Sequence, residues 1–199
     1  MNLDENFKTI EIEFDKLNLA SKAILAKLNK TIANVDYNFD KYELGEAAKT
    51  LYNFAWNDFA AWYVEISKVD LTSNDEQNRL LTQNVLVYVL KAIIKMLHPF
   101  CPFITEELYQ ALPHEEESVM ISSWPKINEE YNDEQSIIAF DDLTTIITAI
   151  RNERAKANKA ISKPIDITIS CKDEDTLNKL KLTKDYLIRF TNPNKLDIT

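Results

Sequence analysis

The chain has 199 residues, of which 45% are hydrophobic and 28% charged, a composition typical of a soluble globular protein with one sizeable core. The formal net charge of -9 excludes a protein that binds nucleic acid over its whole surface, so any such contact needs a local basic face. Gly45 is the only glycine, which excludes glycine-rich phosphate-binding loops and dinucleotide-binding fingerprints.

The cysteines and histidines do not have the spacing of a metal site or a disulfide framework. Cys101 and Cys171 are far apart in the sequence, no CxxC pair occurs, and His98 and His114 are the only histidines. The first residues are acidic and form no apolar leader, and no uninterrupted apolar run approaches about 18 residues. We therefore expect a protein of the reducing cytoplasm that holds no metal.

The first part of the chain predicts a linker and one helix. Residues 1–17 fit both the alternation of a strand and a helical period, and we interpret them as a linker. From about Leu19 a helical period of apolar residues continues to Val35. Its first half contains no acidic residue but carries three lysines: Lys22, Lys27 and Lys30.

Two long helices are predicted next. Residues 42–69 have a broad apolar face, which indicates a central position in a helix bundle. Ser73 and Glu76 have the spacing of a capping box, and the apolar period after them predicts a helix that ends near Leu97.

A sharp corner between two helices is expected at the end of this segment. Pro99 cannot continue a helix and disfavours helical geometry at His98, whereas Pro102 fits the first turn of a new helix. Phe100 and Phe103 are then available to fill the corner. These five residues are therefore expected to be structural.

The short helix after the corner ends at Pro113, and Glu106 and Glu107 are expected near the positive end of its dipole. We interpret His98 as a helix-end residue that bonds to a backbone carbonyl, not as a catalytic group. A solvated acidic turn follows, and residues 119–121 are predicted to be extended.

The last third of the chain predicts one long helix and a small α/β region. An apolar period covers residues 133–160, the segment "IDITISC" alternates as a strand, residues 174–180 fit a polar helix, and "KLDIT" fits a second strand. We expect a mostly α fold, with an antiparallel helix bundle over residues 18–162 followed by a truncated α/β subdomain over residues 163–199.

The most informative constellation is the basic segment "IRNERAKANKAISK", residues 150–163. Arg154 lies along the apolar stripe of its helix, and a charge there must be paired or must leave the core. We expect either a buried ion pair with Asp58 or Glu65, or a guanidinium that extends beyond the bundle to contact RNA. No local pattern of nucleophile and base occurs, so a self-contained catalytic site is not expected.

The aromatic residues of the second helix also have two interpretations. Tyr52, Trp56, Trp62 and Tyr63 occur at helical spacing and fit a buried face, so we expect Trp56 and Trp62 to be structural. An exposed ring beside a basic segment would instead be able to stack on an unpaired base.

The segment "LHPFCPFITEELYQALP", followed by "SWP", resembles a motif shared by the anticodon-binding domains of valyl-, isoleucyl- and leucyl-tRNA synthetases of class I. The segment "KYELGEAAKTLYNFAWNDFAAWYVEISK", with its W-x-x-F-x-x-W-Y-x-E pattern, is similar to the valyl members in particular. The segment "IRNERAKANKAISKPI" resembles their final bundle helix and its exit into a small α/β subdomain. Together these segments span nearly all of the chain.

The resemblance implies a fragment of an ATP-dependent valyl-tRNA synthetase, with residues 1–17 as the linker from its catalytic core. The His-Ile-Gly-His and Lys-Met-Ser-Lys-Ser signatures that bind ATP in this class are absent from the chain. ATP and Mg would therefore bind the catalytic core, and we expect no cofactor and no aminoacylation here. The expected partners are valine tRNA and the catalytic, editing and coiled-coil domains of the parent, with no membrane and a monomeric fragment.

The residues expected to bind tRNA are cations near the two ends of the chain, which would neutralise phosphates, and amides that would read splayed bases. They are Lys22, Lys27, Lys30, Arg151, Asn152, Arg154, Lys156 and Asn158. Two alternatives are a helical protein-interaction module and the equivalent domain of an isoleucyl or leucyl enzyme.

Overall fold

The computed structural model describes residues 7–171 and 174–199, and the chain divides into two compact units, Met1–Glu134 and Gln135–Thr199. Helices dominate both units, which confirms the prediction of a mostly α fold. The predicted boundary lay after residue 162, whereas the units divide before most of the last long helix. That helix is hydrogen-bonded through Arg154 to the segments that follow it.

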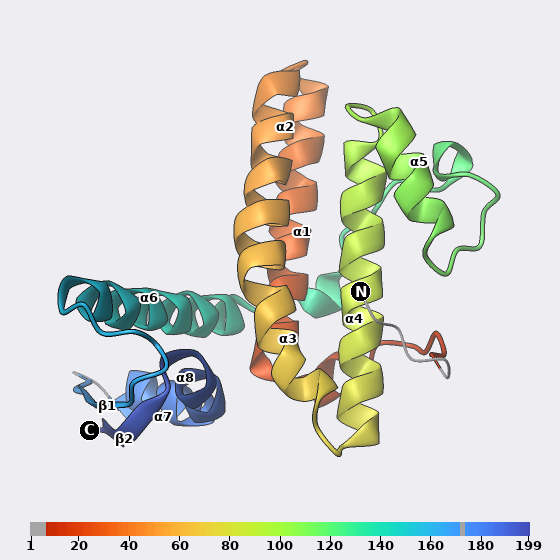
Figure 1. Cartoon of the computed structure of the whole chain (residues 1–199). Coiled ribbons are helices and arrows are strands. Elements are labelled where there is room, and N and C mark those ends of the chain that lie inside the picture. The colour runs from red at the N-terminus through yellow and green to blue at the C-terminus, as the bar shows by residue number, and fades with distance from the viewer. Residues whose placement is uncertain (1–6, 172–173) are drawn as a thin grey trace. The chain divides into compact units, whose positions relative to one another are not determined.

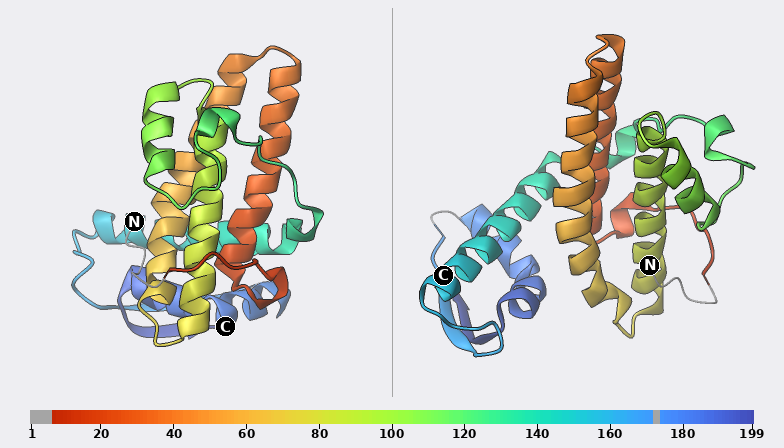
Figure 2. Two further views of the ribbon diagram at one scale, coloured as in Figure 1. Left: turned by 90° about the vertical axis from the view of Figure 1, so that its right-hand side faces the viewer. Right: turned by 45° about the horizontal axis from the view of Figure 1, so that its top comes forward.

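The first unit is built on three antiparallel helical rods that lie side by side (Figures 1 and 2). The first and third rods are single helices, and the second is continuous through a π-helical segment, η2. The predicted helices are thereby confirmed, with the first one several residues longer than expected. The bounds are Leu19–Asp40 for α1, Leu44–Asn53 for α2, Phe54–Tyr63 for η2, Val64–Leu71 for α3 and Glu76–Leu97 for α4.

Asp70 links the ends of all three rods. Its side chain is largely buried, at 9% exposure, and its carboxylate accepts hydrogen bonds from Asn18 Nδ2 and Asn78 Nδ2, both at 3.0 Å. Asn18 is the N-cap of α1, and Asn78 lies in the first turn of α4. Because a buried carboxylate needs donors, this junction fixes where α1 and α4 begin relative to the end of α3.

The capping box predicted at the start of α4 is not formed. Asp75 is the N-cap, and its carboxylate accepts a hydrogen bond from Asn78 N at 3.0 Å. Ser73 Oγ accepts from Asp75 N at 3.1 Å instead. A carboxylate at the positive end of the helix gains from the dipole as well as from the hydrogen bond, which explains why Asp75 replaces Ser73 as the cap.

The corner between α4 and α5 forms as predicted from its prolines. α4 ends at Leu97, and α5 begins with Pro102 in its first turn and ends at Gln110. His98 Nδ1 shares a hydrogen bond of 2.8 Å with Thr105 Oγ1, so the expected carbonyl partner of His98 is wrong. The histidine thus ties the end of α4 to the buried face of α5.

The two phenylalanines of the corner differ in their environment. Phe100 is half-buried and stacks on Phe39 with ring centroids 5.8 Å apart, whereas Phe103 is 92% exposed. The predicted role of Phe103 as a plug is therefore wrong. Thr105 and Tyr109 form the buried face of α5, and Phe103 lies about 200° from Thr105 around the helix.

Three 3₁₀ turns complete the first unit, and one of them replaces a predicted extended piece. They are η1 (Phe14–Lys16), η3 (Val119–Ile121) and η4 (Glu129–Tyr131). Glu106 Oε2 stabilises the η3 turn, because it accepts hydrogen bonds from Ser118 Oγ at 2.7 Å and from Val119 N at 3.2 Å.

Glu106 lies beyond the first turn of α5, so its expected place at the positive helix end is wrong. Hydrogen bonds from Gln110, Ser118 and Val119 hold its pKa below the usual value.

Among the described residues one helix, α4, is long and apolar enough by composition to cross a membrane. Most of its apolar window is buried inside the protein, as in the core helix of a soluble domain. On one side α4 packs against α1 and the second rod.

The second unit combines a long helix with a small α/β layer. Its two strands pair in parallel, with Ile167 opposite Leu196. Both predicted strands and the helix after the first strand are confirmed, but the second short helix was not predicted. The elements are α6 (Glu134–Lys156), β1 (Ile165–Ile169), α7 (Glu174–Leu182), α8 (Lys184–Thr191) and β2 (Pro193–Ile198).

Substitution of the two phenylalanines tests the packing of the corner. Phe100→Ala should lower the free energy of unfolding by about 1–3 kcal/mol, because a half-buried ring loses its stacking on Phe39. Phe103→Ala should change it by less than about 0.5 kcal/mol. Urea denaturation of the two variants measures both values, and equal losses would contradict the described corner.

Candidate nucleic-acid interface

The cations predicted to contact RNA lie on α1 in the first unit and at the end of α6 in the second. The two groups belong to different units, and each is described within its own unit.

The three lysines of α1 are engaged by neighbouring side chains. Lys27 Nζ lies 2.6 Å from Asp58 Oδ1, and the two side chains are 15% and 30% exposed. Lys30 pairs with Glu134 at 2.6 Å, with both side chains exposed, and Lys22 Nζ lies 5.4 Å from the centre of a phenylalanine ring. The acidic partners come from distant segments, which the acid-free first half of α1 does not reveal. The carboxylate of Asp58 therefore offsets most of the attraction of Lys27 for a phosphate.

α6 ends in a left-handed turn at Asn158, whose φ is 50°. Lys159 N donates to Arg154 O at 2.9 Å, and Asn158 N donates to Ala155 O at 3.1 Å. These are the two hydrogen bonds of a Schellman motif. Asparagine is the residue other than glycine that tolerates this conformation best, so Asn158 has a defined structural role in ending the helix.

Arg154 is buried beneath this turn, at 3% exposure. Its Nη1 donates to the carbonyls of Ala160 at 3.2 Å and Lys163 at 2.7 Å. Its Nη2 donates to the carbonyls of Thr191 and Asn192. The guanidinium thereby joins the turn after α6 to the end of α8.

Both interpretations of Arg154 made from the sequence are corrected by this geometry. Asp58 pairs with Lys27 and Glu65 pairs with Lys68, while Arg154 uses backbone carbonyls as acceptors. A guanidinium buried in this way is not placed to contact a phosphate. The apolar stripe indicated burial correctly, but carbonyls that converge from two segments cannot be read from a helical period.

The turn that Arg154 supports carries exposed cations. Arg151 lies over the ring of Phe190, 5.5 Å from its centre, and Lys156 pairs with Glu153 at 2.6 Å. Lys159 and Lys163 are exposed and have no ion-pair partner within residues 7–171 and 174–199. Neither lysine was in the predicted binding set, although the basic run contains both. We call Arg151, Lys156, Lys159 and Lys163 the basic turn; Asn152 is exposed on the same helix.

An exposed aromatic pair lies on the second rod of the first unit. Tyr52 and Trp56 are 59% and 62% exposed, and their rings stack with centroids 6.3 Å apart and an angle of 6° between planes. The prediction that Trp56 is a core residue is therefore wrong, while Trp62 is half-buried.

The π-helical geometry explains this exposure. The buried aromatic residues of the segment are Phe54, Phe59 and Tyr63, at spacings of five and then four residues. A π-helix has more residues per turn than the α-helical period used for the prediction, so the buried face shifts away from Trp56.

Metal-binding residue types do not gather in the described part of the chain. No group of three His, Cys, Asp or Glu residues there is arranged to hold a metal ion. Cys101 and Cys171 are free cysteines.

Comparison with known proteins identifies the fold and its general role. The family model described as the anticodon-binding domain of tRNA ligase matches residues 21–169, from α1 to the end of β1. The chain belongs to this family. Valine–tRNA ligases of Staphylococcus aureus, among them those of strains JH9, Newman and Mu3, are 45% identical to it over 200 residues. This alignment covers 100% of the chain and 23% of each relative, so this anticodon-binding domain spans about a quarter of the length of the curated relatives it matches.

Substitution of Arg154 tests its structural role in the anticodon-binding domain. Arg154→Met should destabilise the second unit by about 3–5 kcal/mol, because it removes a buried guanidinium that donates to four backbone carbonyls. Lys156→Ala, an exposed cation two residues away, should cost less than about 0.5 kcal/mol. Hydrogen exchange of the amides in residues 157–192 measures the effect, and equal protection in the two variants would show that Arg154 does not hold the turn.

Proposed function

We propose that this chain is the tRNA anticodon-binding domain of a valine–tRNA ligase. The observation that carries the proposal is the 45% identity with valine–tRNA ligases over the whole chain, together with the family match of residues 21–169. The domain would hold the anticodon stem and loop of valine tRNA so that its acceptor end reaches a catalytic core elsewhere in the parent enzyme.

Catalysis would belong entirely to the rest of the parent protein. ATP and Mg would bind there and supply the activation of valine, while the residues of this domain bind and orient the tRNA. The parent enzyme would act in the cytoplasm, with catalytic, editing and coiled-coil domains as neighbours of this one.

The basic turn is the strongest candidate for phosphate contacts in this role. Its four cations are exposed on a short stretch of chain, and two of them have no carboxylate partner in the described residues. Arginine and lysine at such positions bind phosphates without regard to sequence. Arg154 and Asn158 would act indirectly, because they fix the backbone from which these cations project.

Base contacts require groups of a different kind. Asn152 is an exposed amide beside the basic turn, and the Tyr52 and Trp56 rings offer an exposed stacking surface in the first unit. Single-stranded loops are recognised by stacking on aromatic side chains and by hydrogen bonds to base edges. Lys22 and Lys30 stay in the proposed set, because the pair of Lys30 with Glu134 is exposed, whereas Lys27 is largely buried in its pair with Asp58.

The alternative of a protein-interaction module is favoured by one observation. Several apolar side chains of α5 and η3 are exposed, and α5 contacts η3. Exposed apolar groups of this kind occur at protein interfaces. They are Phe103 at 92%, Ile104 at 57%, Met120 at 72% and Ile121 at 64% exposure.

Binding of valine tRNA across a salt series tests the basic turn. Arg151→Ala and Lys156→Ala should each weaken binding and lower the slope of log affinity against log salt by about one unit. Lys68→Ala, which removes a paired cation of α3, is the matched control and should change neither quantity. Because the chain is acidic, we expect dissociation constants of about 1–100 µM at physiological salt. Sub-micromolar affinity, or no effect of either basic-turn variant, would contradict the assignment.

Substitution of the anticodon tests the specificity of the proposed function. A gel shift with valine tRNA should be stronger than one with the same tRNA carrying an altered anticodon. The affinity should fall about tenfold for each base whose pair of hydrogen bonds to the domain is removed. Equal or absent shifts would favour the protein-interaction module. Preference for isoleucine or leucine tRNA would instead assign the domain to one of those enzymes.

A further inference from the structure

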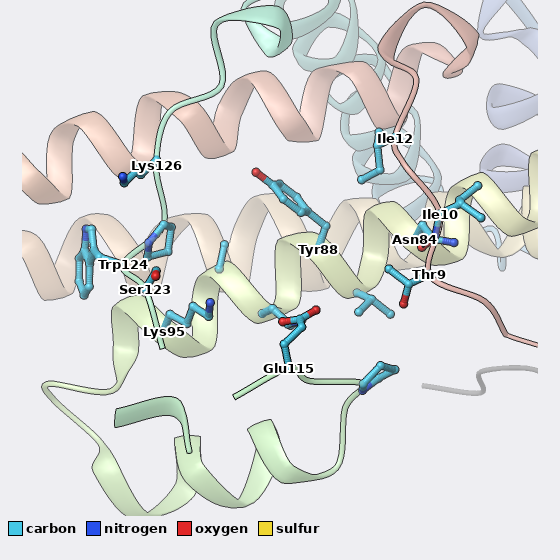
Figure 3. A pocket seen from close by; sticks show the side chains of 15 residues that line it. Thr9, Ile10, Ile12, Asn84, Tyr88, Lys95, Glu115, Ser123, Trp124 and Lys126 are labelled. Atoms are coloured by element: carbon cyan, nitrogen blue, oxygen red, sulfur yellow. Dashed lines mark hydrogen bonds and ion pairs between the residues drawn. The ribbon is translucent and has the colours of Figure 1, made fainter. Parts of the chain in front are cut away.

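A pocket of about 530 Å³ lies in the first unit, along one face of α4 (Figure 3). Its walls come from the segment before η1, from the loop after α5 and from the segment after η3. Figure 3 shows Tyr88 between the segment of Ile10 and Ile12 and the loop of Trp124 and Lys126. The volume is within the range of about 300–1,000 Å³ that small-molecule sites occupy.

The wall before η1 is fixed in place by a side chain of α4. Asn84 Oδ1 accepts a hydrogen bond from Ile10 N, and Asn84 Nδ2 donates to Lys8 O, both at 3.0 Å. On the opposite wall Trp124 Nε1 donates to Asp36 Oδ1 at 2.7 Å, which orients the indole. Both walls are thus held by side-chain hydrogen bonds, and the pocket is formed before any ligand binds.

The pocket is cationic although the chain is acidic. Lys91, Lys95 and Lys126 line it, against Glu115 as the single acidic lining residue. Lys91 is paired with Glu115 at 3.0 Å, and its side chain is only 16% exposed. Lys95 and Lys126 have no hydrogen-bond or ion-pair partner in the described residues. Two ammonium groups are therefore left without a protein acceptor at the edge of an apolar floor.

Lys95 is held in an environment that disfavours its charge. Desolvation and the neighbouring Lys91 lower its pKa, and Glu115 and Glu116 compensate in part. Figure 3 shows Lys95 and Glu115 extending toward one another. Glu115 forms its ion pair with Lys91, and Lys95 is too far from Glu115 to form a second one. An anion placed between Lys91 and Lys95 would relieve their repulsion.

The apolar part of the pocket suits a flat ring. Ile10, Ile12, Val87 and Ala92 line it beside the rings of Tyr88 and Trp124. The Tyr88 hydroxyl makes no hydrogen bond within the described residues, so it is available to a base edge. A ligand that combines an aromatic ring with a phosphate matches both halves of the lining.

We propose that this pocket binds one nucleoside monophosphate unit, with its base beside Tyr88 and its phosphate at Lys95 and Lys91. The unit comes either from a free nucleotide or from one unstacked nucleotide of a bound RNA, since the chemistry is the same. The second source rests on the proposed function, whereas the first does not. The residues of the pocket belong to the first unit, and those of the basic turn belong to the second.

Two substitutions with opposite expected effects test the pocket. Titration of the chain with AMP and with UMP, followed by NMR, should show saturable binding with a dissociation constant on the order of 1 mM. Lys95→Ala should weaken it about tenfold, because one charge-assisted hydrogen bond is lost. Glu115→Gln should tighten it several-fold, because Lys91 is released from its carboxylate. Lys68→Ala on α3 is the control and should leave binding unchanged.

The opposite signs separate a binding role from damage to the fold. A substitution that only disturbs the structure weakens binding, so tighter binding by Glu115→Gln supports the pocket directly. Inorganic phosphate alone should bind more weakly than AMP if the base also contacts the pocket. The proposal is overturned if no saturable binding occurs, if Lys95→Ala binds as the unsubstituted chain does, or if phosphate binds as well as AMP.

A competition experiment distinguishes the two sources. If the ligand is a nucleotide of bound tRNA, AMP or UMP should compete with tRNA and Lys95→Ala should weaken tRNA binding. If the ligand is free, both should bind together and tRNA affinity should be unchanged in Lys95→Ala. Both outcomes support the pocket, and neither depends on the basic-turn variants, so the proposed function can fail while the pocket stands.

Discussion

The central constraint on this domain is electrostatic: a chain with a net charge of -9 has to bind RNA, which is a polyanion. The chain has 32 acidic residues against 23 lysines and arginines, and several of the cations pair with a carboxylate, as Lys27, Lys30 and Lys68 do. Such pairs contribute little stability at the surface and cancel the local potential. The surface potential is therefore positive only where no carboxylate lies close to a cation. The surroundings of a cation thus predict whether it can bind a phosphate better than its place in the sequence does.

Arg154 shows how the second unit meets this constraint. A buried guanidinium is usually paired with a carboxylate, but the Nη1 and Nη2 groups of this one donate to backbone carbonyls of the segments around residues 160–163 and 191–192, while its Nε is buried without a partner in the described part of the chain. Arg154 thus needs no carboxylate partner, whereas Lys156 of the basic turn pairs with an acid, Glu153. Asn158 and Asn192 both adopt left-handed backbone geometry at this point, with φ of 50° and 43°, which presents the carbonyl of Asn192 to Arg154.

Local patterns predicted the helices and the corner well, because apolar periodicity and proline chemistry act over a few residues. The position of Pro102 in the first turn of α5 is an example. The failures came from geometry or contacts beyond a sequence window. Trp56 is exposed because its segment is π-helical, and Lys27 is neutralised by a residue 31 positions away. Lys159 and Lys163 belong to the basic run of the sequence, and both are exposed. Arg154 in the same run is buried, because its guanidinium bonds to backbone carbonyls that a sequence window does not show.

The separation of charge into small local sites also determines how recognition can work. At physiological salt the Debye length is about 8 Å, so an exposed cation acts on groups close to it and scarcely senses the net charge of the chain. The basic turn and the Lys95 pocket can therefore each attract an anion despite the total of -9. The same screening limits long-range attraction of RNA, so under the proposed function discrimination between tRNAs has to come from short-range stacking and hydrogen bonds. Aromatic side chains such as Tyr88 of α4, whose ring packs edge-on against Tyr131, and the Tyr52 and Trp56 pair suit that role better than lysines, because they lose less side-chain entropy when a base binds.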